Sequence, residues 1–378
     1  MSEYQYYEFQ AVDQPLNAAK REQLRAISSR ARITATSFVN SYDWGDLKAD
    51  PLKLLERYFD LFLYVANWGT RRFAMRLPKR LIELQALGRF QLDEDLACIR
   101  STGEHVIISI NRDEVEADEW NDGGGRLAGL APLRADLLAG DLRLFSLLWL
   151  IQVENGKIPD KAIEPAPGLT ELSGPLAAFA EFLAVDPDLL EAAAGTGTPL
   201  LSSEPSPGEV DAFVRNLPEQ DKVALLLRLY AGDDPHLSAD LRRRCREDHG
   251  ARADTVSPSR TAGELRAAAR RIAGDRTRLA EERAIAEHRR RQEAEAQARA
   301  KHLLALAKRG EDAWREIGDL IVMRNASAYD KAATLLLDLR EIAAEASKRE
   351  SFASRLAELY CRHARKGQLI ARLKAAGL

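Results

Sequence analysis

The spacing of apolar residues along the first 153 positions predicts a domain that mixes strands with helices. Apolar and polar residues that alternate, with many β-branched or aromatic members, are typical of strands that bury one face. On this basis we expect three strands, at residues 4–12, 33–42 and 70–77, and then a hairpin over residues 96–111.

Helical spacing separates these strands. Asn17 is suited to cap a first helix, and Asp50 followed by Pro51 marks the start of a second, because Asp accepts backbone N–H groups and Pro fits the first turn. Apolar residues then recur at helical spacing up to Val65, so the pattern predicts one helix that presents Leu54, Leu55, Tyr58, Leu61, Phe62 and Val65. Two apolar helices, near 133–139 and 141–153, complete an α+β domain over residues 1–153.

The remaining chain reads as mainly helical. Proline and glycine gather over 154–208, which predicts a linker with a short helix. A helical segment over 209–250, a long charged helix over 258–309 and a C-terminal helical docking tail over 311–378 follow. The expected fold class is therefore an α+β N-terminal domain followed by a mainly α-helical C-terminal half with one long charged helix, mostly α overall.

The charged segment has an unusual pattern. Residues 260–309 contain fourteen lysines and arginines against seven acids, a net charge of +7, although the whole chain carries −3. A coiled-coil spacing of Leu265, Ile272 and Leu279 ends at Ala286 and Glu293. Opposite charges four residues apart replace it, as in Arg289–Glu293 and Glu287–Arg291, and each such pair stabilises an exposed helix by roughly 0.2–0.5 kcal/mol. The sequence therefore predicts a solvated helix over 281–299.

Composition restricts the setting of the protein. Three cysteines spread over 378 residues argue against a disulfide framework and predict a reducing, cytoplasmic location. The richness in alanine and arginine suggests a bacterial source. The most apolar stretch, 142–153, is far shorter than the ~20 residues of a membrane span, so we expect no membrane association.

Searches for familiar chemistry return no catalytic residue, cofactor or metal site. A phosphate loop and a Gly-x-Ser-x-Gly elbow are both absent, and the string Gly123-x-Gly125-x-x-Ala128 lacks the strand that a dinucleotide site needs directly before it. Only Cys361 and His363 form a close pair of zinc-type ligands, and two residues of separation on a helix point them apart.

One cluster of residues suggests nucleic-acid binding. No acid lies between Leu61 and Ile82, whereas basic and aromatic residues interleave there. In the strand over 70–77, arginines alternate with apolar residues and are expected to face away from the core. The cluster could contact phosphates and stack a base, or be an ordinary solvent face. Together with three arginines of the charged helix, the candidate nucleic-acid-binding residues are Trp68, Arg71, Arg72, Arg76, Lys79, Arg80, Arg289, Arg290 and Arg291.

Two resemblances add expectations. The motifs YQYYEF (4–9), YDWGD (42–46) and YVANWGT (64–70) resemble an uncharacterised bacterial protein family, which implies no activity. Residues 328–378 resemble the helical tail of bacterial SWIM zinc-finger proteins. The SWIM motif itself, Cys-x-Cys followed by Cys-x-His, is missing its first half, so the resemblance implies a docking tail without zinc.

The leading functional hypothesis is a non-enzymatic interaction or scaffold protein that acts through its helical C-terminal region, with another protein as partner. Two alternatives stay open. One is a nucleic-acid-associated accessory protein that uses the basic-aromatic cluster. The other is an enzyme with an unfamiliar site in the N-terminal domain, where Trp44, Asp46, Lys48, Trp68 and Arg71 concentrate unusual residues. The sequence does not indicate an oligomeric state.

Overall fold

The structure is a computed structural model that describes residues 3–115, 123–165, 169–195, 206–232, 234–248 and 260–378. The chain divides into two compact units, 1–275 and 276–378. The segments 154–208 and 209–250, which the sequence sets apart from the N-terminal domain, both belong to the first unit. An antiparallel sheet forms the first unit together with helices, and the second is helical, as the sequence predicts.

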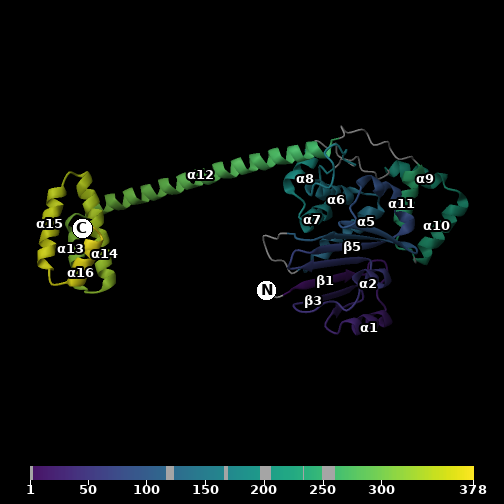
Figure 1. Cartoon of the computed structure of the whole chain (residues 1–378), viewed down its shortest axis with the longest axis horizontal. Coiled ribbons are helices and arrows are strands. Elements are labelled where there is room, and N and C mark those ends of the chain that lie inside the picture. Colours follow the sequence, from purple (N-terminus) through teal and green to yellow (C-terminus); the bar gives the residue numbers. More distant parts are fainter. Residues whose placement is uncertain (1–2, 116–122, 166–168, 196–205, 233, 249–259) are drawn as a thin grey trace. The chain divides into compact units, whose positions relative to one another are not determined.

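The sheet has seven strands in the order β2-β3-β1-β4-β5-β7-β6, with every neighbouring pair antiparallel (Figure 1). All the predicted strands are confirmed, although the second is split in two. The strands are β1 (Gln5–Gln10), β2 (Arg32–Ile33), β3 (Ser37–Tyr42), β4 (Leu61–Ala66), β5 (Arg71–Pro78), β6 (Ala97–Thr102) and β7 (His105–Arg112).

The predicted helix over 51–65 is wrong in its second half. Helix α2 ends at Tyr58, and residues 61–66 form the central strand β4, which lies between β1 and β5. Every residue of β4 is buried, because both faces of the sheet are covered. A strand that is buried on both faces reads as a continuous apolar run, and such a run matches helical spacing equally well.

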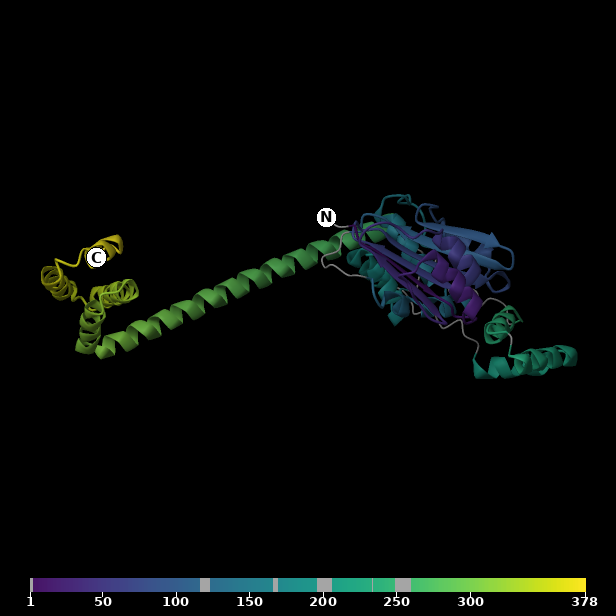
Figure 2. The same ribbon diagram turned by 90° about the horizontal axis from the view of Figure 1, so that it is seen from below.

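Helices cover the two faces of the sheet separately (Figures 1 and 2). On one face, α1 (Ala18–Ile27) and α2 (Pro51–Tyr58) pack over a core that contains Phe9 and Phe62. Asn17 and Asp50 cap these helices through their side chains, as predicted. The other face is covered by α4 (Arg126–Leu130), α5 (Pro132–Leu138), α6 (Arg143–Glu154), α7 (Gly174–Phe182) and α8 (Pro187–Ala194).

Further helical elements complete the first unit. They are η1 (Lys79–Leu81), α3 (Leu84–Leu87), η2 (Gly88–Phe90), α9 (Pro207–Asn216), α10 (Glu219–Ala231) and α11 (Leu237–Asp248). None of the residues described in α10 is buried. Its Leu226, Leu227, Leu229 and Tyr230 are 62–92% exposed, so this helix presents an apolar surface to solvent.

A buried ionic network joins the sheet to the helices at one end of β5. Asp60 is 1% exposed and accepts hydrogen bonds from the backbone of Val12 and Asp13 and from the Arg76 guanidinium. Arg134 of α5 is 4% exposed and forms two hydrogen bonds, of 2.9 and 2.7 Å, with the Asp13 carboxylate. His236 Nε2 lies 2.8 Å from the same carboxylate. Asp13 is thus the point where β1, α5 and the start of α11 meet.

Helix α12 (Ala262–Arg309) is one continuous helix of 48 residues. Leu265 and Ala269 are buried in the core of the first unit, whereas Leu303 and Leu306 are buried near the other end of the helix. Every residue from 274 to 302 is exposed. The structure therefore confirms a long charged helix with a solvated middle.

The second unit packs four helices against the end of α12. They are α13 (Glu311–Val322), α14 (Ala326–Glu345), α15 (Arg349–Arg362) and α16 (Gly367–Ala375). Ile317, Ile321, Leu336, Leu369 and Leu373 are fully buried in their shared core. Across the described residues of both units, no helix is long and apolar enough to cross a membrane.

Candidate functional site

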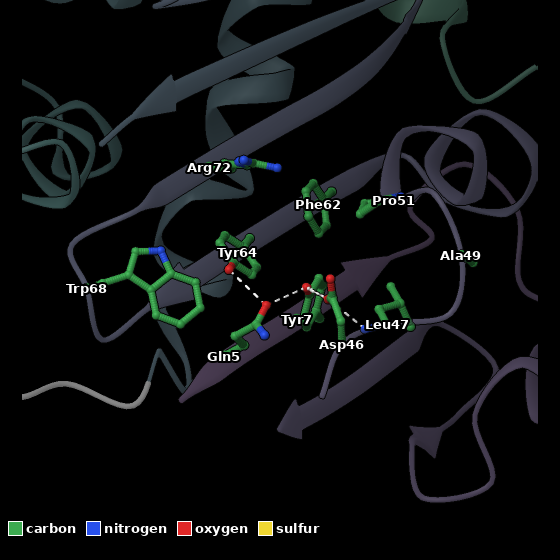
Figure 3. Close-up of a pocket in the computed structure, with 10 residues that line it drawn as sticks. All are labelled: Gln5, Tyr7, Asp46, Leu47, Ala49, Pro51, Phe62, Tyr64, Trp68 and Arg72. Atoms are coloured by element: carbon green, nitrogen blue, oxygen red, sulfur yellow. Dashed lines mark hydrogen bonds between the residues drawn. The ribbon is translucent and has the colours of Figure 1, made fainter. Parts of the chain in front are cut away.

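A pocket of about 370 Å³ opens on the face of the sheet that carries α2 (Figure 3). Strands β1, β4 and β5 form its floor, and the loop after β3, the start of α2 and the β4–β5 turn form its walls. The volume falls within the range of roughly 300–1,000 Å³ that is typical of ligand pockets. Ten residues line it: Gln5, Tyr7, Asp46, Leu47, Ala49, Pro51, Phe62, Tyr64, Trp68 and Arg72.

A hydrogen-bond network fixes the polar part of the floor. The Gln5 amide donates to the Gly45 carbonyl at 2.9 Å, which sets its orientation. Its Oε1 then accepts from the Tyr64 hydroxyl at 2.9 Å and lies 2.8 Å from the Tyr7 hydroxyl. The Tyr7 hydroxyl also contacts Asp46 Oδ1, to which the Leu47 backbone N–H donates at 2.7 Å. Figure 3 shows this chain of contacts running from Tyr64 to Asp46.

Both phenols stay protonated near neutral pH. Burial raises the pKa of Tyr7, and the hydrogen bond to Asp46 raises it further. Burial also raises the pKa of Tyr64 to about 12, against the opposing effect of the Arg72 charge. Each hydroxyl therefore acts as a hydrogen-bond donor rather than as a base or a nucleophile.

Arg72 stands at the rim of the pocket. Its Nε donates to Asn111 Oδ1 at 3.0 Å, and the guanidinium lies 5.4 Å from the centroid of the Tyr64 ring. No residue in the described part of the chain accepts a hydrogen bond from its two terminal nitrogens. Trp68 is 48% exposed and borders the pocket from the β4–β5 turn.

The predicted basic-aromatic cluster is divided by the sheet. Arg72 and Arg76 share one face of β5 opposite Phe73, as the alternation predicts, whereas Arg71 lies on the other face and donates to the Phe182 carbonyl. Arg76 forms a 2.7 Å ion pair with the buried Asp60. Arg80 pairs with Asp234 at 3.1 Å.

Other candidates for phosphate contact lie apart from the pocket. Lys79 is exposed in η1. Arg289 and Arg291 pair with Glu293 and Glu287 along α12, as the charge spacing predicts, and Arg290 is exposed between them. Of the nine predicted nucleic-acid-binding residues, Trp68 and Arg72 are the two that line the pocket.

Sequence reasoning missed three members of the site. Gln5, Tyr7 and Tyr64 come from β1 and β4, whose pairing brings together residues 59 positions apart. The tyrosine-rich start of the chain alternates Gln5, Tyr7 and Phe9 on one face, and this alternation was the only signal available. Asp46 and Trp68 were already noted as unusual residues of the N-terminal domain, and the structure places both at the pocket.

The thiols offer no metal centre in the described residues, where no group of three His, Cys, Asp or Glu side chains converges. Cys361 lies exposed near the end of α15, and His363 follows that helix.

Comparisons with known proteins give no relative. No protein-family model matches the chain, and neither a curated protein nor a solved structure matches it.

Proposed function

We propose that this chain is a non-enzymatic interaction or scaffold protein in which α12 is a spacer between two folded units and the helical C-terminal region binds a protein partner. The observation that carries this proposal is the uninterrupted exposure of residues 274–302 within one helix. These 29 exposed residues bury no side chain in a core. They add length instead, because an α-helix rises about 1.5 Å per residue, and so they separate the two ends of the segment.

The side chains of α12 suit a single solvated helix. Arg289 and Glu293 pair at 2.8 Å and Arg291 and Glu287 at 2.5 Å, all largely exposed. Such pairs contribute a few tenths of a kcal/mol each and keep the helix soluble. A coiled coil would need an apolar seam with a seven-residue repeat, which the helix lacks after Leu279.

A groove of about 660 Å³ in the second unit supports partner binding there. Its apolar lining comes mainly from α14 and α15 and includes Ala344, Phe352, Ala353 and Leu356. Arg340 and Arg349 also line the groove: Arg340 donates to the Gly377 carbonyl at 2.6 Å, and neither forms an ion pair with a carboxylate of the described residues. Residues 310–378, which form most of the groove, contain twelve lysines and arginines against ten acids, a net charge of +2. In the lining itself, Arg299, Arg340 and Arg349 outnumber the acidic Glu341. The occupant that fits this chemistry is an amphipathic peptide segment with acidic residues beside its apolar face.

The groove can be tested without a known partner. Random 16-residue peptides are selected for binding to the full-length protein and then titrated against two variants of α15. Ala353→Glu places a carboxylate in the groove, whereas Ala357→Glu makes the same change at an exposed position one turn later that is outside the groove lining. We expect the selected peptides to be acidic and amphipathic, and to lose at least tenfold in affinity for the first variant only.

Two results would contradict the proposal. Peptides that bind Ala353→Glu and the unchanged protein equally well would show that the groove is not the binding surface. A selection that yields no peptide with acidic residues would remove the charge argument. Melting temperatures of both variants close to that of the unchanged protein serve as the folding control.

A further inference from the structure

Two solvent-exposed polar groups that line the sheet pocket have atoms without a partner among the described residues. Within the described part of the chain, the guanidinium of Arg72 donates through Nε alone, to Asn111, and its terminal nitrogens have no acceptor there. Oδ2 of Asp46 has no donor, because both contacts of this carboxylate are made by Oδ1. The terminal guanidinium nitrogens of Arg72 and Oδ2 of Asp46 therefore border the same cavity.

An aromatic floor separates these two groups. Tyr7 of β1 is paired with Tyr64 of β4, and Tyr64 with Arg72 of β5, so the three residues form one row across the sheet. Strands lie about 4.8 Å apart, which puts the backbones of Tyr7 and Arg72 roughly 10 Å from each other. Phe62 extends the floor in the neighbouring row. Figure 3 shows Asp46 beside Tyr7, with Tyr64 and Phe62 between this pair and Arg72.

We propose that this pocket binds a planar aromatic carboxylate that bears a hydroxyl or amino group on the far side of its ring. The carboxylate pairs with the terminal nitrogens of Arg72, which form the two-pronged donor that suits two carboxylate oxygens. The ring lies in the cavity beside the accessible edges of Tyr64 and Phe62, and its hydroxyl or amino group donates to Asp46 Oδ2. This inference concerns the first unit and is independent of the scaffold function.

The charges around Arg72 favour a carboxylate over a phosphate. Asn111, which holds Arg72 Nε, also donates to Asp113 at 2.9 Å, so a second carboxylate lies close behind the guanidinium. If a phosphate were bound, Arg72 alone would have to balance Asp46, Asp113 and the nearly two negative charges of the phosphate. A ligand with a single negative charge leaves the site closer to electrical balance.

Trp68 provides a side wall, and the turn that carries it is tightly constrained. Gly69 has φ +89°, and a Cβ there would lie 2.8 Å from the Val115 backbone. Only glycine meets both conditions, so the backbone of the β4–β5 turn that carries Trp68 is fixed beside the pocket. The half-exposed indole can then contact one face or edge of the bound ring.

Titration calorimetry with 4-hydroxybenzoate as the probe tests the site in the full-length protein. Two relatives of the probe separate its groups: 4-hydroxybenzamide lacks the charge, and benzoate lacks the hydroxyl. We expect 4-hydroxybenzoate to bind at micromolar to low millimolar concentration, and each relative to bind at least fivefold more weakly. AMP and inorganic phosphate should bind more weakly still.

Variants assign the binding to the pocket. Arg72→Ala should weaken 4-hydroxybenzoate at least tenfold, and Asp46→Asn should remove the preference for the probe over benzoate. Lys79→Ala removes an exposed cation outside the pocket and should change nothing. Because the Asp46 variant can disturb the loop after β3, melting curves accompany each titration, and the comparison of probes on the unchanged protein needs no variant. The proposal is overturned if 4-hydroxybenzoate does not bind at 5 mM, if Arg72→Ala binds it normally, or if AMP binds more tightly.

Discussion

Replacement of Arg134 with methionine should destabilise the first unit by about 3–5 kcal/mol, the cost of breaking a buried ion pair by removing one partner. Arg134 is 4% exposed and donates to Asp13 through two nitrogens and to the Arg76 carbonyl through a third. Its loss leaves the Asp13 carboxylate and the Asp60 carboxylate, 3.8 Å from Arg134, with fewer compensating charges in a buried setting. Methionine keeps most of the volume, so the effect reports charge rather than packing.

This stability is measured by urea unfolding of the full-length protein, followed through the hydrogen-exchange protection of amides in β1, β4 and β5. These amides belong to the first unit and report it separately from the helical unit. Arg100→Met at an exposed position of β6 is the matched control and should change stability by less than about 0.5 kcal/mol. A loss below about 1 kcal/mol in the Arg134 variant would mean that the network contributes little.

The second large effect is a loss of stability in acid that depends on Asp13. Burial disfavours its charged form, but the hydrogen bond from His236 and the charge of Arg134 outweigh this and lower the pKa of Asp13 to about 2. A carboxyl with a lowered pKa binds fewer protons in the folded than in the unfolded state. Its stabilising contribution is complete above pH ~4 and is lost as the pH falls towards 2. A change of nearly two pKa units corresponds to about 2 kcal/mol.

Asp13→Asn isolates this contribution from other carboxylates. The variant should be less stable than the unchanged protein at pH 7, and the difference between the two should shrink as the pH falls from 4 to 2. Unfolding free energies measured at several pH values on both proteins give this difference directly. Parallel losses of stability in the two proteins would contradict a role for Asp13 ionisation.

The sequence predicted local features well because their signals lie within a few residues. The alternation in β5 correctly places Arg72 and Arg76 on the face opposite Phe73, and charges four apart correctly predict a long exposed helix at α12. The caps at Asn17 and Asp50 were found for the same reason, since a cap depends on a side chain and the next three backbone groups.

The features that failed depend on contacts between distant segments. Strand β4 matches the local spacing of a helix, because its burial on both faces comes from layers formed elsewhere in the chain. The ionic network joins Asp13 to residues 121 and 223 positions away, which no local pattern indicates. The pocket depends on the pairing of β1 with β4, so Trp68 and Arg72 could be noted individually but not assigned to a cavity.

The central claim is that residues 274–302 of α12 form a solvated spacer, and small-angle scattering of a proline variant tests it most directly. Ala294→Pro removes one backbone hydrogen bond and clashes with the carbonyl of Arg290, and no packed neighbour restores the lost contacts. We predict a changed radius of gyration and maximum dimension, with the melting of both units unchanged. Ala294→Ser, the matched control, should leave the scattering unaltered. Scattering that does not change in the proline variant, or loss of folding in either unit, would contradict the spacer.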